Sequence, residues 1–218
     1  MDSLTQAVLG GAVTYAVMGR RTGARAVLIG AVLGTIPDLD VLIDFGGPIE
    51  NMTYHRGFSH SIFVQALVTP LFAWVLARPK RLNDPVFMQW CLAIYLCFVT
   101  HTLADTLTVY GTQLFWPLTD HPYAYSILFI VDPAYTVPLI IGCLGAWLLR
   151  RGDRAMRLNA AMLIVSTLYL LWSSGAKWSI DQRVAQAMVL RGIQPSVYES
   201  TPAPLNTLLW RGVAVQGD

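Results

Sequence analysis

Long apolar runs broken by short basic segments are the feature that most restricts the fold of this chain. Of its 218 residues, 55% are hydrophobic and only 13% are charged, whereas a typical soluble domain has roughly 25% charged residues. A helix needs a run of about 20 apolar residues to cross a hydrocarbon core of ~30 Å. The sequence therefore predicts an all-α fold, a polytopic membrane bundle of about six spans.

The apolar runs follow one another with little chain between them. We expect the first two helices at Ser3–Met18 and Ala24–Ile43, the second interrupted by Pro37 because proline lacks the N–H that continues a helix. The other four are expected at His60–Leu76, Val86–Leu107, Ile127–Leu149 and Leu158–Gly175. Residues 1–175 would then form one membrane-embedded domain, and residues 176–218 a short tail with an amphipathic helix and an extended segment.

Basic residues predict the orientation of the bundle. Ten of the fifteen Lys and Arg residues fall in the first-second, third-fourth and fifth-sixth connections: Arg20, Arg21, Arg25, Arg78, Lys80, Arg81, Arg150, Arg151, Arg154 and Arg157. With six spans these connections share one side, which the positive-inside rule makes cytoplasmic. Both termini, the tail and residues 44–59 and 108–126 are then expected on the outer side.

Histidines and aspartates gather where the apolar runs meet the outer side. Six of them are candidate metal ligands: Asp38, Asp40, His55, His60, His101 and Asp105. An ionised side chain in the membrane costs roughly 2.5–3.5 kcal/mol, so a set at one depth needs a compensating partner such as a divalent metal. His101 and Asp105 are four apart and share a helix face. The sequence predicts one or two divalent transition-metal ions, with Zn²⁺ the leading candidate.

Each of these motifs also has a purely structural interpretation. An Asp-Leu-Asp after a proline is commonly a helix-end cap, and a lone His-x-x-x-Asp is commonly a hydrogen-bonded pair. His55 and His60 can be ordinary polar residues of a loop and a helix start, with Ser59 capping the helix. The convergence of three motifs at one depth favours a shared metal site over these alternatives.

Four motifs carry a resemblance to a known family: MDSLT at residues 1–5, PDLD at 37–40, HRGFSHS at 55–61 and HTLAD at 101–105. In this order, over about residues 1–175, they resemble the YdjM-like family of inner-membrane metal-dependent hydrolases, which often have a histidine where Gln6 stands. The resemblance implies a multi-pass protein of the bacterial inner membrane and a hydrolase with Asp and His ligands. More distantly, the His-x-x-x-Asp is similar to that of zinc-dependent phospholipases C and P1-type nucleases, which cleave phosphoesters.

Three further residues are candidates for catalysis. Arg56, between two histidines, is suited to a bidentate contact with phosphate, or alternatively pairs with Asp44 or Glu50 at the headgroup level. Asp40 is the candidate proton acceptor. His121, in a loop, is a candidate base or further ligand, although Asp-His-Pro is commonly a turn.

The function that these observations favour is hydrolysis of a phosphoester of a lipid or lipid-linked substrate at the outer leaflet. The expected partners are membrane lipid and this lipid-like or phosphorylated substrate, and no nucleic acid. The alternatives are hydrolysis of a lipid amide or ester, metal transport, and a non-catalytic membrane role. Transport needs polar groups through the whole depth, and the inner halves of the runs are almost purely apolar. A zincin peptidase is not expected because no His-Glu-x-x-His occurs.

Overall fold

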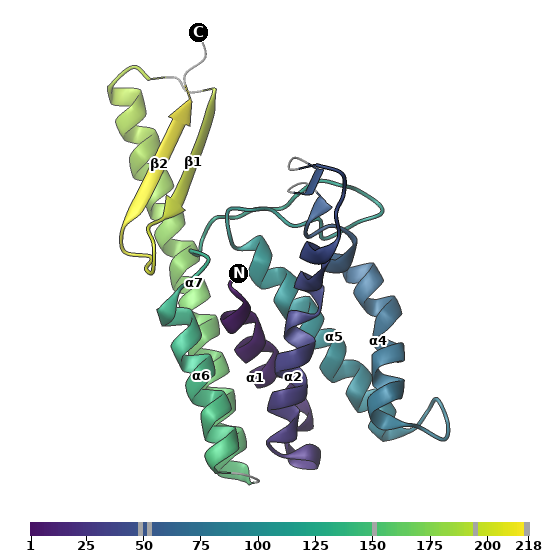
Figure 1. Cartoon of the computed structure of the whole chain (residues 1–218). Coiled ribbons are helices and arrows are strands. Elements are labelled where there is room, and N and C mark those ends of the chain that lie inside the picture. Colours follow the sequence, from purple (N-terminus) through teal and green to yellow (C-terminus); the bar gives the residue numbers. More distant parts are fainter. Residues whose placement is uncertain (48–49, 52–53, 150–151, 194–195, 216–218) are drawn as a thin grey trace.

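Six long helices run back and forth between the two ends of a bundle (Figure 1). The computed structural model describes residues 1–47, 50–51, 54–149, 152–193 and 196–215. The long helices are α1 (Ser3–Thr22), α2 (Arg25–Thr35), α4 (Ile62–Ala77), α5 (Pro85–Thr106), α6 (Pro133–Leu148) and α7 (Asp153–Leu190). Two short 3₁₀ helices, η1 (Pro37–Leu42) and η2 (Phe58–His60), lie between α2 and α4. The prediction of a mainly helical chain is confirmed.

Capping residues decide where the helices start. Ser61 accepts hydrogen bonds from the first turn of α4, and Asp84 and Asp132 do so for α5 and α6, each directly before a proline. Proline suits the first helical position because its missing N–H has no partner there. The fifth helix, predicted from Ile127, therefore begins only at Pro133, and the prediction was wrong for its first turn and a half.

The second predicted helix is shorter than expected. It ends at Thr35, and the chain continues as η1 instead of reaching Ile43 as α-helix. Pro37 cannot donate the backbone hydrogen bond that would extend α2. The break turns the chain so that Asp38 and Asp40 leave the axis of α2 and lie on η1.

The last helix is one element where two were predicted. α7 passes through Gly175 without interruption and has 38 residues. A Cβ at Gly175 would meet no atom within 4 Å, so no close packing requires a glycine at this position. The predicted boundary between residues 175 and 176 is therefore not a helix end, and the division into two domains stays a prediction.

A two-stranded antiparallel sheet follows α7. β2 (Trp210–Val215) confirms the extended segment predicted in the tail, but its partner β1 (Val197–Pro202) was not predicted. Lys177 of α7 donates to the carbonyl oxygen and the hydroxyl of Ser200, both at 2.8 Å. The sheet packs along the final turns of α7, to the side of the other helices (Figure 1).

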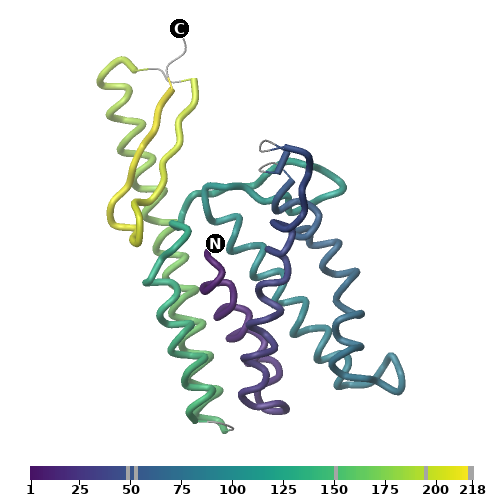
Figure 2. The backbone as a smooth tube through the Cα atoms, in the orientation of Figure 1, coloured from purple at the N-terminus to yellow at the C-terminus, as the bar shows by residue number. Residues whose placement is uncertain are grey.

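The basic connections lie together at one end of the bundle (Figures 1 and 2). This end carries the α1–α2 and α4–α5 connections and the start of α7, whereas η1, η2 and residues 107–132 lie at the opposite end. Arg150 and Arg151 fall outside the described residues. The described basic residues at this end are Arg20, Arg21, Arg25, Arg78, Lys80, Arg81, Arg154 and Arg157.

Two helices among the described residues have the length and apolar composition needed to cross a membrane. They are α5, with 22 residues, and α7, with 38. Helices α4 and α6 are apolar but shorter. A crossing by all six helices, which the sequence predicts, remains a prediction.

Glycines let α1 and α2 pack backbone to backbone. A Cβ on Gly10 would lie 2.3 Å from the carbonyl oxygen of Gly30, and one on Gly34 would lie 2.5 Å from that of Gln6. Glycine permits such an approach because it has no side chain, as is common between membrane helices. The contact places Gln6 and the carbonyl of Gly34 beside α5, where the candidate site lies.

Candidate metal centre

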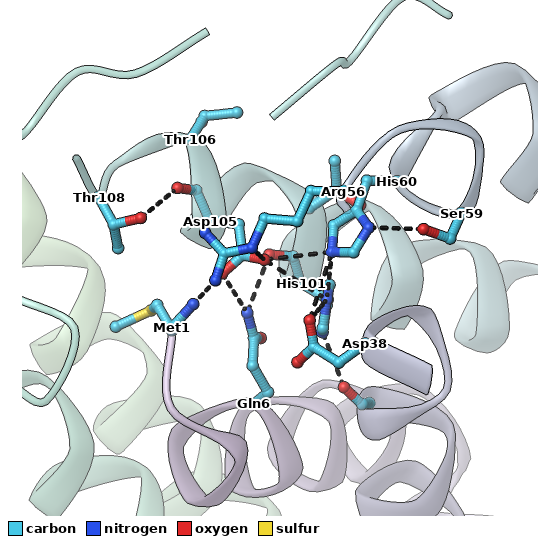
Figure 3. Close-up of polar contacts among 12 residues, drawn as sticks. Met1, Gln6, Asp38, Arg56, Ser59, His60, His101, Asp105, Thr106 and Thr108 are labelled. Carbon is cyan, nitrogen blue, oxygen red and sulfur yellow. Dashed lines mark hydrogen bonds and ion pairs between the residues drawn. The ribbon is translucent and has the colours of Figure 1, made fainter. Parts of the chain in front are cut away.

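Four side chains from η1, η2 and α5 point toward one another (Figure 3). Asp38, His60, His101 and Asp105 each offer one ligand atom, and these four atoms lie within 4.8 Å of one another. The two Nε2 atoms of the histidines are 3.1 Å apart. Asp105 Oδ2 lies 3.2 Å from His60 Nε2 and 3.8 Å from His101 Nε2, and Asp38 Oδ1 is 3.5 Å from both.

These spacings fit a single ion. Ligands held 2.0–2.2 Å from a tetrahedral zinc ion lie about 3.3 Å apart, and the five separations between the ligand atoms given above scatter around that value. Asp38 Oδ1 is buried and makes no hydrogen bond, and such an oxygen is costly unless a cation or donor compensates it. A set of two imidazoles and two carboxylates suits Zn²⁺ and other first-row divalent ions.

Both imidazoles are oriented by their second ring nitrogen. His101 Nδ1 lies 2.7 Å from the carbonyl oxygen of Gly34, so this nitrogen carries the proton and donates it. His60 Nδ1 lies 2.8 Å from Ser59 Oγ, which donates to Asp40 Oδ2 at 2.5 Å. With Nδ1 of each ring bonded outside the cluster, Nε2 is the atom that each ring directs into it, as is usual for histidine ligands of metals.

The carboxylates of the site are kept ionised. Burial alone would raise the pKa of the Asp38 carboxyl, but the rings of His101 and His60 outweigh it and hold this pKa well below its ordinary value. Burial opposes the ionisation of Asp40 too, yet contacts from His55 and Ser59 lower its pKa. Such ionised carboxylates favour a bound cation.

Asp105 is the most enclosed ligand. Its side chain is fully buried and is paired with the amino group of Met1 and, at 3.3 Å, with Arg56 Nε. Gln6 Nε2 donates to Asp105 Oδ1 at 3.0 Å. These contacts leave Oδ2 directed at the two histidines (Figure 3).

Asp40 and His55, which the sequence predicts as ligands, lie beside the cluster and not among its four atoms. His55 Nδ1 lies 2.8 Å from Asp40 Oδ1, and the other oxygen of Asp40 accepts from Ser59 and from the backbone N–H of Arg56. Asp40 thus orients the cluster through Ser59 and His60. Direct ligation by Asp40 or His55 stays a prediction, as does the role of Asp40 as proton acceptor.

Arg56 is held in a strained backbone conformation with its side chain over the cluster. Its φ is 65°, which is unfavourable for a side chain with Cβ. The backbone N–H donates to Asp40 at 2.9 Å, and the carbonyl accepts from the Gln113 N–H at 3.0 Å. These two hydrogen bonds hold the strained backbone in place, and such strain is common at functional sites.

The guanidinium of Arg56 still has unused donors. Its Nη1 is buried and has no hydrogen-bond partner, and its carbon lies 5.5 Å from the centre of the Tyr110 ring. Asp44, the alternative partner suggested by the sequence, accepts instead from Gly46 and Asn51. The free donors suit an anion that enters next to Asp105.

A cavity of about 520 Å³ gives access to this arginine. It is lined by Asp40, His55, Arg56 and Tyr110, with apolar residues such as Ile43 and Ile130 around them. A volume of this size is within the range of small-ligand sites. The side chain of Asp38 is 21% exposed, so the cluster is not sealed, and that of His55 beside it is 31% exposed.

His121 lies away from the cluster. It is exposed in the loop after α5, and its ring packs edge-on against Tyr123, with the ring centres 4.9 Å apart. The Thr119 hydroxyl accepts from its backbone N–H at 3.1 Å, which is typical of a turn. Its proposed role as a base stays a prediction.

Sequence reasoning missed several residues that support the ligands. Ser59 does not cap α4, since Ser61 does, and it links Asp40 to His60 instead. Gln6 supports Asp105, and the family resemblance had marked this position. No sequence pattern pointed to the backbone carbonyl of Gly34.

Comparison with known proteins places the chain in a family. The YdjM inner membrane protein family matches residues 1–179. The inner membrane protein YbcI of Escherichia coli is 32% identical over 102 residues, which are 45% of this chain and 57% of YbcI. The uncharacterized protein YfhP of Bacillus subtilis is 28% identical over 115 residues, 50% of this chain and 33% of YfhP.

The chain thus covers less than two thirds of the length of either relative. No solved structure matches significantly. The family match, in contrast, covers most of the chain and includes all four residues of the cluster. The chain therefore belongs to the YdjM inner membrane protein family.

Proposed function

We propose that this protein is a membrane-embedded, metal-dependent hydrolase that cleaves a phosphoester of a lipid or lipid-linked substrate. The observation that carries the proposal is the convergence of Asp38, His60, His101 and Asp105, with both histidines oriented by their Nδ1 atoms. Two ring nitrogens and two carboxylate oxygens directed at one point form the kind of ligand set that a divalent transition metal prefers.

A divalent ion at this position would polarise a phosphoryl oxygen and lower the pKa of a bound water toward 7. The chain's own residues would do the rest. Arg56 would bind phosphoryl oxygens through its free donors, because a guanidinium makes a planar two-point contact with phosphate. Asp40, which lines the same cavity, would take the proton from the attacking water.

The place of the site in the bundle supports a lipid substrate. The cluster lies at the end of the helices opposite to the basic connections, which the positive-inside rule assigns to the cytoplasm. The site would then face the periplasmic side at about headgroup depth. A lipid phosphate reaches such a site sideways, without leaving the bilayer.

Elemental analysis of the purified protein tests the metal centre. We expect a transition metal in the intact protein and its loss in His60→Ala and His101→Ala, since each variant removes one ligand. His121→Ala is the matched control, because this histidine is exposed in a loop and its loss should leave the metal content unchanged.

Hydrolysis assays on the metal-loaded protein test the reaction. A panel of phosphatidic acid, polyprenyl phosphate, an aryl phosphate and carboxylic-ester and amide lipids separates the possible bonds. We expect cleavage of the phosphoesters. A protein without metal above trace would refute the centre, and a metal-loaded protein that cleaves only esters or amides would refute the phosphoester assignment alone.

A further inference from the structure

A second cavity of about 320 Å³ lies directly beside the candidate metal centre, between η1, η2, α4 and α5. Most of its lining is apolar, including Leu39, Phe58, Val68 and Phe98. We call this cavity the η1–α4 groove. An apolar cavity of this kind is suited to hydrocarbon and not to a polar ligand.

The polar residues of the groove form one connected patch next to the cluster. They are Asp40, Ser59 and Gln65. Ser59 donates to Asp40 Oδ2 at 2.5 Å, and Gln65 Nε2 donates to the Ser59 carbonyl at 3.1 Å. Since Ser59 also contacts His60 Nδ1, this patch is one residue away from the proposed ligands.

The groove adjoins the cavity that contains Arg56. Asp40 and Ile43 line both spaces, so the two lie on either side of these residues, next to the metal centre. The first space is thus lined by the guanidinium-bearing Arg56, and the second by apolar walls. This combination matches an amphiphile with an anionic head and a hydrocarbon chain.

We propose that the η1–α4 groove binds the hydrocarbon chain of a phosphorylated lipid whose phosphate lies at Arg56 and the metal centre. The inference rests on the proposed function and names its substrate as an alkyl or isoprenyl phosphate. Leu39, Ile43 and Phe58 are 53%, 44% and 39% exposed, so the groove opens at the surface of the bundle. The chain of a lipid can enter there from the bilayer.

A second apolar groove provides an internal control. It has a volume of about 500 Å³, lies between α2 and α4, and is lined only by apolar residues such as Leu28, Val32 and Val75. It shares Ile36 and Phe72 with the η1–α4 groove but none of its polar residues, so the control labelling is measured at Leu28, Val32 and Val75, which line this groove alone. Bulk lipid should fill it without regard to the headgroup.

Photo-crosslinking in phosphatidylcholine nanodiscs tests the inference. The probes are a long-chain alkyl phosphate with a diazirine in its chain and the matched alkyl alcohol. We expect the phosphate probe to label Val64 and Val68, and excess unlabelled alkyl phosphate, but not the alcohol, to suppress this labelling. The α2–α4 groove should be labelled equally by both probes.

Val68→Trp fills the groove, and Leu67→Trp is the matched control because Leu67 is 79% exposed and is not part of the lining. We expect Val68→Trp to lower labelling of the groove, and kcat/KM for the long-chain phosphate, by about tenfold or more. Hydrolysis of a water-soluble aryl phosphate and labelling of the α2–α4 groove should not change, which shows that the variant is folded.

Equal labelling of the η1–α4 groove by phosphate and alcohol would overturn the inference, since the groove would then hold bulk lipid. A Val68→Trp variant that behaves like Leu67→Trp would overturn it too. If Val68→Trp does not fold, the probe competition on the unmodified protein still decides. Phosphate-dependent labelling without any hydrolysis would refute the proposed function and keep the binding site.

Discussion

Replacement of Gly34 by alanine should weaken the metal centre without touching a ligand. A Cβ at this position would lie 2.5 Å from the carbonyl oxygen of Gln6 and 3.2 Å from the Cα of Gly10. Both are backbone atoms, so no side chain can rotate away. Relief therefore requires α1 and α2 to separate by roughly 1 Å, the shortfall from ordinary van der Waals contact.

The separation would act on two supports of the site at once. Gly34 supplies the carbonyl that orients His101, and Gln6 donates to Asp105. Loss of such supporting contacts typically lowers metal affinity about 10–100-fold. Overpacking of this kind should also lower the free energy of unfolding by about 1–3 kcal/mol.

Metal affinity by competition with a chelator, and thermal unfolding in detergent, measure the two effects. Gly175→Ala is the control, because a Cβ there meets no atom within 4 Å. In a helix this exchange should stabilise by about 0.5–1 kcal/mol and leave metal affinity unchanged. If Gly34→Ala instead has the same unfolding temperature and the same metal affinity as the parent protein, close packing of α1 on α2 does not position the centre.

Three other changes test separate parts of the proposal. Arg56→Ala should lower turnover about 10²–10³-fold with metal retained, and Arg56→Lys should recover only part because the planar contact is lost; equal activity of all three forms would exclude a role at the phosphate. Asp40→Asn should lower the metal affinity measured by equilibrium dialysis about 10–100-fold. An unchanged affinity would show that Asp40 does not support the ligands. Single cysteines placed at Arg21, Arg81 or Asp153, on the basic side, should react only with a reagent added to the cytoplasmic face. Reaction of all three from the outer face would show that the predicted orientation is wrong.

Local chemistry made most of the helical core predictable. Asp84 and Asp132 each precede a proline at a helix start, but the prediction used neither signal, which is why it began the fifth helix at Ile127 and not at Pro133. His101 and Asp105 could be paired from their spacing alone, because positions four apart share one face of a helix. The break at Pro37 was also predicted, because proline lacks the backbone N–H that continues a helix.

Long-range geometry was not predictable in this way. His55 and His60 look equivalent in the sequence, but only His60 reaches the cluster, because the chain between them turns at Arg56 with a φ of 65°. Contacts with Asp40 and Gln113, distant in the sequence, hold that turn. The strand β1 likewise makes contacts with a segment distant in the sequence, such as that of Ser200 with Lys177 of α7.

The break at Pro37 explains why the centre forms at the end of α2. The last four carbonyls of a helix have no partner within it, and Gly34 belongs to the last turn of α2. Its carbonyl is therefore available to accept from His101, and the negative end of the helix dipole points the same way. The turn after α2 brings Asp38 Oδ1 to 3.5 Å from the Nε2 atoms of both rings. The helix break at Pro37 thus places the ligand Asp38 and also leaves the Gly34 carbonyl available to orient the ligand His101. This is why the PDLD motif and the distant HTLAD motif form a single site.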